Sequence, residues 1–216
     1  MKLVLTGGTG HLGQVLATSL QKQGHEIVVV TRGPANGPGV LQWDGRPFGP
    51  WARALCEANT PATRKVALRS AIVMSPERGG VFDILMNLTR FGLGGTIAGG
   101  RQFVSWIHDR DFARAVDLPL ARDDISGPVN LAAPRPLPQR AFMAALRTVA
   151  GMPIGVPATA WMFEIAAFVQ RTETELLLKS RRVVPGRLLE TGFQFEHPAW
   201  PGAATDLVAR WRQGGN

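Results

Sequence analysis

The residues with the clearest chemistry are the glycines of residues 6–13, which read Thr-Gly-Gly-Thr-Gly-His-Leu-Gly. They follow a short apolar run at residues 3–5 and open an amphipathic stretch at residues 14–23. A strand, a glycine turn and a helix in this order bind phosphate, because backbone N–H groups of the turn approach a pyrophosphate and the helix N-terminus carries partial positive charge. In this context the spacing predicts a dinucleotide site.

Five residues of this segment have an expected part in the site. Gly7 can take backbone angles that a side chain would forbid, Gly10 leaves room for the nucleotide, and Gly13 lets the helix pack closely on the strand. His11 and Leu12 are expected to supply backbone N–H groups to the pyrophosphate. The alternative is a plain glycine turn without a ligand.

The second strand is expected to read the adenosine ribose. Residues 26–30 are almost all apolar and β-branched, as in a strand buried on both faces, and they lead into Thr31 and Arg32. An acidic residue about 20 residues past the glycines would suit NAD, whereas an arginine can hold a 2′-phosphate by charge-assisted hydrogen bonds. We therefore predict NADP as the preferred cofactor, with NAD as the alternative. The other reading of Arg32 is an ordinary surface residue after a strand.

Composition and charge narrow the class of protein. The chain has 216 residues, 45% of them hydrophobic and 19% charged, which is typical of one globular domain with at most a small appendage. The net charge is +8, but the basic residues are scattered, and the one dense cluster, residues 179–182, suits a solvated helix end better than a nucleic-acid surface. We expect no nucleic-acid partner.

Cysteine use and hydropathy indicate the compartment. Cys56 is the only cysteine, so no internal disulfide is possible. No signal-peptide pattern is seen and no apolar run is long enough for a bilayer, so we predict a cytoplasmic protein without a membrane partner. No metal site is predicted.

Further along the chain, the pattern predicts alternating strands and helices. Strands are expected at residues 2–5, 26–30, 40–43, 65–74, 102–108 and 127–132. Helices are expected at residues 12–23, 51–58, 81–91, 111–118, within 136–150, and at 158–180. Asp109 is the expected N-cap of the helix at 111–118, and a turn is expected at Gly192.

Four segments together resemble the atypical and extended short-chain dehydrogenase/reductase superfamily. Within it the chain looks most like the "epimerase family" proteins that end in a small domain of unknown function. The segments are the nucleotide fingerprint at 6–13, Ser-Trp-Ile-His at 105–108 with Asp111, Gly-Pro-Val-Asn-Leu-Ala-Ala-Pro at 127–134, and residues 182–193. The resemblance implies a Rossmann-like, doubly wound parallel sheet in an NAD(P)-binding domain at 1–134. It also implies a small, mostly helical substrate-side domain at 135–216.

The middle of the chain departs from this family. Active relatives carry a Ser/Thr and a Tyr-x-x-x-Lys segment there, in which the tyrosine is the general acid/base and the lysine lowers its pKa. This chain contains no tyrosine, and none of its lysines lies in a matching motif. An internal deletion near residues 55–56 would remove at least two central strand–helix steps of about 30 residues each.

The function expected from these features is that of an NAD(P)-binding, epimerase/dehydratase-like protein with impaired catalysis, so its status as an enzyme stays open. The catalytic residue is unknown: His108 fits a strand residue better than an acid/base group, and Asp111 fits a helix-start residue. A non-catalytic interaction or redox-sensing protein and a marginally folded deletion product are the alternatives. Loss of central strands would also leave an apolar edge that invites a homodimer. The substrate is not indicated.

Overall fold

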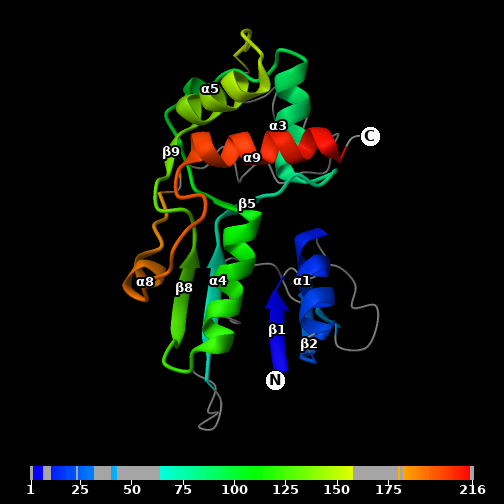
Figure 1. The fold of residues 1–216 in the computed structure, drawn as a ribbon, viewed down its shortest axis with the longest axis vertical. Coiled ribbons are helices and arrows are strands. Elements are labelled where there is room, and N and C mark those ends of the chain that lie inside the picture. The colour runs from blue at the N-terminus through cyan, green and yellow to red at the C-terminus, as the bar shows by residue number, and fades with distance from the viewer. Residues whose placement is uncertain are drawn as a thin grey trace. The chain divides into compact units, whose positions relative to one another are not determined.

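The computed structural model of the chain describes residues 2–6, 11–22, 24–31, 40–42, 64–157, 180 and 182–214 (Figure 1). By the contacts within them, these residues fall into two compact units, Met1–Lys65 and Val66–Asn216. The domain boundary that the sequence predicts between residues 134 and 135 stays a prediction.

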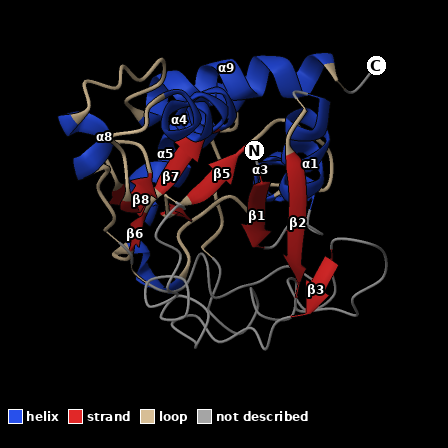
Figure 2. Ribbon diagram, turned by 90° about the horizontal axis from the view of Figure 1, so that it is seen from below, coloured by secondary structure: helices blue, strands red, loops and turns tan. Residues whose placement is uncertain are grey.

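The first unit is the strand–helix–strand arrangement that the glycine pattern predicts. Strand β1 (Lys2–Thr6) leads through residues 7–10 to helix α1 (His11–Lys22), and β2 (Glu26–Thr31) and β3 (Val40–Gln42) follow. The strands are parallel in the order β1-β2-β3 (Figure 2). Parallel neighbours need a crossover connection, and α1 is that connection between β1 and β2.

Helix α1 ends at a glycine and packs on β2 through an apolar face. Gly24 has φ of 84°, a left-handed conformation that favours glycine, and its N–H donates to the carbonyl of Gln21 at 2.9 Å. The N–H of His25 donates to the carbonyl of Leu20 at 3.1 Å. Leu20 and Ile27 are both buried. Burial of such side chains is the main force that holds a short helix on a sheet.

In the described residues of the second unit, the strands form three pairs. β4 (Val66–Ser70) runs parallel to β8 (Gly127–Leu131), and β5 (Ile72–Met74) runs parallel to β7 (Trp106–His108). The pair of β6 (Phe103–Val104) and β9 (Leu137–Pro138) is antiparallel. These pairs bring the region before residue 75 beside the region after residue 102.

The sequence predicts one strand over residues 65–74, and this prediction is wrong in one respect. The chain changes partner at Ala71, whose N–H donates to the carbonyl of Leu131 at 2.9 Å. One residue later the N–H of Ile72 donates to the carbonyl of Ser105 at 3.2 Å. Residues on either side therefore pair with different strands, β8 and β7. An unbroken apolar run does not encode such a change of neighbour.

Three helices of the second unit lie near predicted ones, whereas the sequence pattern did not predict α8 (Gly186–Glu190) or α9 (Trp200–Gln213). α3 (Val81–Arg90), α5 (Gln139–Ala150) and the turn at Gly192 are close to their predicted places. Helix α4 covers Asp109–Ala121 and so extends beyond the predicted range of 111–118 at both ends. Asp109 is not its N-cap. His108 takes that position, and its Nδ1 accepts a hydrogen bond from the N–H of Arg110 at 3.2 Å. Residues 51–58 and 158–179, where two more helices are predicted, lie outside the described residues.

The core of this unit lies where three helices meet. A short 3-10 helix, η1 (Ala98–Gly100), and α8 (Gly186–Glu190) precede the last helix, α9 (Trp200–Gln213). Helix α9, in red in Figure 1, contacts α5, which in turn contacts α3. Large side chains fill the space between them, among them Met74, Phe82, Leu85, Met86, Trp106, Phe142, Leu146, Trp200 and Leu207.

Asp83, on α3, forms a buried polar contact with the end of α9. Its carboxylate accepts hydrogen bonds from Nε1 of Trp211 at 2.7 Å, the N–H of Gly79 at 2.9 Å and the guanidinium of Arg78 at 3.0 Å. Burial raises the pKa of Asp83, but the bonds from Gly79, Trp211 and Arg78 outweigh it, so the pKa lies below its ordinary value. A lowered pKa gives stability above the pKa of the unfolded chain, and that stability is lost as pH falls towards the folded value.

We expect Asp83→Asn to lower the free energy of unfolding at pH 7 by about 1–3 kcal/mol, because Asn cannot accept all three hydrogen bonds. The difference between wild type and variant should shrink as pH falls below about 4, because there the Asp83 carboxyl takes up a proton in the unfolded wild-type chain before it does so in the folded one. Urea unfolding at pH 7 and at lower pH measures this. An equal difference at both pH values would contradict the assignment.

Candidate functional site

The nucleotide site predicted from the glycines is expected at one edge of the first sheet. In the parallel pairing of β1 and β2, Thr6 lies opposite Val30, so both strands end at nearly the same level. Adjacent strands are about 4.8 Å apart, so the carboxyl ends of β1 and β2 lie side by side. In open parallel sheets, ligands bind at this carboxyl edge.

The structure places part of the predicted set of residues at this edge. His11, Leu12 and Gly13 form the first turn of α1, and Gly13 is half-buried. Thr31 is the last residue of β2. Gly7, Gly10 and Arg32 lie outside the described residues, so their parts in the site stay predictions.

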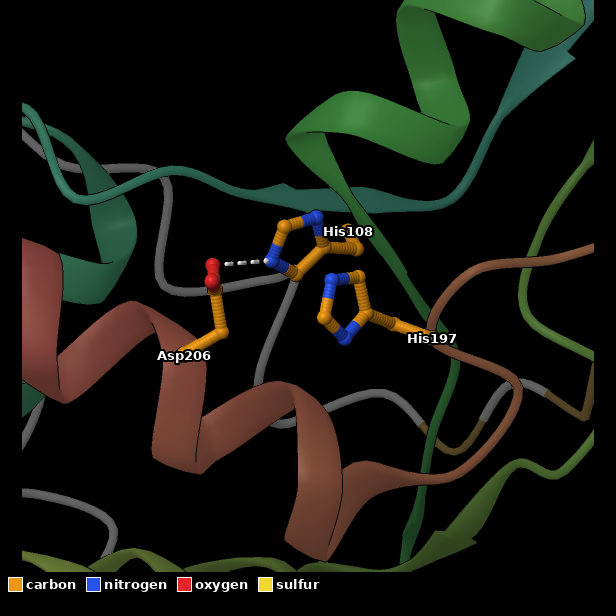
Figure 3. A group of neighbouring side chains, drawn as sticks. All are labelled: His108, His197 and Asp206. Carbon is orange, nitrogen blue, oxygen red and sulfur yellow. Dashed lines mark hydrogen bonds and ion pairs between the residues drawn. The ribbon is translucent and has the colours of Figure 1, made fainter.

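A second group of polar side chains surrounds His108 in the other unit (Figure 3). His108 ends β7 and is fully buried. Its Nε2 lies 3.0 Å from Oδ2 of Asp206 on α9. Its ring stacks on the ring of His197, with centroids 3.8 Å apart and planes 25° apart. His197 comes from the loop that precedes α9, so the group joins three separate parts of the chain.

Asp109 and Arg210 complete the polar network around His108. Oδ1 of Asp109 is 3.0 Å from Nδ1 of His108, and Arg210 donates to both Asp109 oxygens at 2.9 and 2.6 Å. Arg210 also donates to Asp206 at 3.1 Å. Burial raises the pKa of Asp109, but the hydrogen bonds from His108 and Arg210 outweigh it and hold that pKa far below its ordinary value. Asp109 is therefore a carboxylate at neutral pH.

Asp111 anchors the loop that carries His197. It lies in the first turn of α4 with no exposed surface, and its two oxygens accept the backbone N–H groups of Glu196 at 2.8 Å and His197 at 2.9 Å. The prediction that Asp111 is a helix-start residue is confirmed. The structure adds that its side chain bonds to a loop 85 residues further along the chain.

His108 is a strand residue, as predicted, and its surroundings do not favour an acid/base group. The ring is buried and both nitrogens have partners within the protein. Sequence reasoning missed His197, Asp206, Asp109 and Arg210 as its neighbours. Sequence spacing gives no signal for His197, Asp206 or Arg210, since Asp206 is 98 residues from His108, and Asp109 was interpreted only as an N-cap.

Known relatives match both this network's region and the chain as a whole. Residues 158–207 match the family described as "Domain of unknown function (DUF1731)". Epimerase family protein SDR39U1 of Mus musculus is 36% identical over 149 residues, which are 68% of this chain and 50% of that protein. The protein of the same name from Bos taurus is 24% identical over 299 residues and covers 97% of this chain and 100% of itself.

The chain is thus similar to epimerase family proteins over most of its length. The crystal structure of human epimerase family protein SDR39U1 (isoform2) with NADPH matches with a TM-score of 0.69 at 22% identity, covering 97% of this chain and 99% of that one. This likeness confirms the predicted α/β, Rossmann-like fold. The region matched at 158–207 agrees with the predicted small C-terminal domain.

The chain is shorter than these relatives. In the match to the Mus musculus protein, it spans about half of that protein's length. The full-length alignment with the Bos taurus protein takes up 97% of these 216 residues, so about 90 of its 299 positions have no counterpart here. Such a gap is expected for a chain with an internal deletion. The expected junction near residues 55–56 lies outside the described residues. In the described part of the chain, no helix is both long and apolar enough to cross a bilayer.

Proposed function

We propose that the protein binds NADP(H) through the adenosine half of a dinucleotide site and lacks the acid/base group of active relatives. The observation that carries this proposal is the register of the first sheet. Thr6 lies opposite Val30, so β1, which precedes the glycine segment in sequence, and β2, which precedes Arg32, end at the same edge of the sheet. A related human protein of the same fold, crystallised with NADPH, supports the choice of ligand class.

The preference for NADP rests on Arg32, which follows the last residue of β2. At this position an acidic side chain accepts hydrogen bonds from the ribose hydroxyls of NAD and repels a 2′-phosphate. A guanidinium at the same place attracts the phosphate and donates to its oxygens. Thr31 and Arg32 are therefore the residues that we assign to the ribose.

The proposed loss of catalysis rests on the residue types present. A tyrosine has an ordinary pKa of about 10 and needs a nearby cation to act near neutral pH. The chain has no tyrosine at any position, and its four lysines lie at positions 2, 22, 65 and 179. We expect no turnover of NADPH with carbonyl compounds or sugar nucleotides. Robust turnover would show that another residue acts as the acid/base.

Replacing Arg32 with Ala is expected to weaken NADPH binding by about 10- to 100-fold, because the hydrogen bonds to a charged phosphate are lost. NADH affinity should stay within about twofold, since NADH has no 2′-phosphate for the arginine to hold. Quenching of intrinsic tryptophan fluorescence measures both dissociation constants.

The matched control is Lys22→Ala, which removes one positive charge from an exposed position at the other end of α1. This variant should bind NADPH as the wild type does. An equal loss of NADPH and NADH affinity in Arg32→Ala, or an equal loss in both variants, would count against a 2′-phosphate contact.

A further inference from the structure

We propose that His108, His197 and Asp206 form a binding site for a divalent transition-metal ion, with Zn²⁺ as the expected ion (Figure 3). Each residue offers one ligand atom, and these atoms all lie within 4.8 Å of one another. The donors come from the end of β7, from the loop before α9 and from α9 itself. An ion at this place would link the last helix to the strand–helix junction at His108.

The donor set suits zinc. Two imidazole nitrogens and one carboxylate oxygen are a common set of three protein ligands, and the fourth position of a tetrahedral ion is then left for water. Ligand atoms of tetrahedral zinc are about 3.3 Å apart, given bond lengths of about 2.0–2.1 Å. Nε2 of His108 and Oδ2 of Asp206 are 3.0 Å apart, so these two atoms already have nearly this spacing.

His197 must move closer to complete the site. Its backbone N–H is fixed by Asp111 at 2.9 Å, while its side chain is half-buried and stacks on His108. A rotation of the ring about its side-chain bonds can bring a nitrogen nearer by the needed distance, up to about 1.5 Å, without moving that backbone anchor. Because His197 and Asp206 are both partly exposed, an ion can reach the site from solvent.

Asp109 provides the hydrogen-bond acceptor that a ligating imidazole needs at its second ring nitrogen. Without an ion, Nε2 lies 3.0 Å from Oδ2 of Asp206, and Nδ1 faces the N–H of Arg110 and Oδ1 of Asp109. An ion at Nε2 requires the neutral ring that carries its hydrogen on Nδ1. Oδ1 of Asp109, 3.0 Å away, is placed to accept it. A carboxylate behind a ligating histidine is the usual arrangement at zinc sites.

Two arginines oppose the ion and limit its affinity. Arg210 donates to Asp206 at 3.1 Å, and Arg110 lies 3.7 Å from the other oxygen of that carboxylate. Arg210 also donates hydrogen bonds to both oxygens of Asp109, so the positive charge of Arg210 is largely neutralised. Half of the Arg110 side chain is exposed, so it can turn to water when an ion binds. We therefore expect an ion that a chelator removes.

The experiment uses the full chain without an affinity tag, treated with chelator and then titrated with Zn²⁺ by calorimetry. Binding of one equivalent is expected, with visible absorption of a tetrahedral complex when Co²⁺ replaces Zn²⁺. His197→Phe keeps a ring to stack on His108 and removes the ligand nitrogens, so affinity should fall at least about 100-fold. The matched control is Glu196→Gln, which changes the adjacent, exposed side chain and should bind as the wild type does.

Far-ultraviolet circular dichroism establishes that each variant is folded. Should His197→Phe fail to fold, Asp206→Asn serves instead, because an amide keeps an oxygen towards His108 but is a much weaker ligand. Absence of stoichiometric zinc binding by the wild type would overturn the proposal. Binding by a folded ligand variant with wild-type affinity would place the ion on other residues and would overturn it too. Neither outcome bears on the nucleotide proposal, since the titration contains no nucleotide.

Discussion

Replacing Asp111 with Ala is expected to lower the free energy of unfolding by about 3–5 kcal/mol, the range measured when one partner of a buried charged contact is removed. Asp111 has no exposed surface, and its carboxylate accepts the backbone N–H groups of Glu196 and His197. Alanine would leave both donors without an acceptor, and water cannot replace it without opening the structure. The loop before α9 would lose its anchor on α4.

Two further variants separate this contact from a general effect of charge. Asp111→Asn retains one acceptor oxygen and should lose roughly half as much stability. Asp117→Ala removes the same charge from an exposed position on the same helix, and its effect should stay within about 0.5 kcal/mol. Urea unfolding followed by circular dichroism gives all three values. If Asp111→Ala and Asp117→Ala were equally stable, the assigned contact would be refuted.

Replacing Trp200 with Ala is expected to cost a similar amount, about 3–5 kcal/mol, by leaving a cavity in the core. The indole of Trp200 is buried and stacks on Phe142, with centroids 3.8 Å apart and planes 15° apart. It also meets Trp106 edge-on at 5.0 Å, and its Nε1 donates to the carbonyl of Phe142 at 2.9 Å. These contacts hold α9 against α5.

The variant Trp200→Phe distinguishes packing from hydrogen bonding. It retains an aromatic ring beside Phe142 but leaves the carbonyl of that residue without its donor. We expect a loss of about 1–3 kcal/mol, clearly smaller than for alanine. Circular dichroism is the right probe, because the substitution itself changes tryptophan fluorescence. A loss below about 1 kcal/mol in Trp200→Ala would mean that α9 does not depend on this contact.

Local patterns in the sequence account for the elements that local physics controls. The apolar runs that became β1 and β2 and the amphipathic stretch of α1 were all correctly placed. The turn at Gly192 was also correct: its φ is 77°, and its N–H donates to the carbonyl of Leu189, as expected where a helix ends at a glycine. In each case the residues that determine the element are neighbours in the chain.

Features that depend on distant residues could not be predicted in this way. The change of strand partner at Ala71 depends on where Leu131 and Ser105 lie. The network around His108 depends on α9, about a hundred residues away, although the capping hydrogen bond from Arg110 to His108 is local. Asp109 was a reasonable N-cap by residue type, but its carboxylate is held by Arg210. Periodicity and capping preferences carry no information on such long-range contacts.

The most direct measurement for the proposed function is a calorimetric titration of the folded protein with NADPH and, separately, with adenosine 2′,5′-bisphosphate. The second ligand keeps the adenosine and its 2′-phosphate but has no nicotinamide. If the chain retains only the adenosine half of the site, both ligands should bind at one equivalent, with dissociation constants within about tenfold of each other. If neither binds, the glycine turn is not a nucleotide site, and if NADPH alone binds, the nicotinamide half is intact.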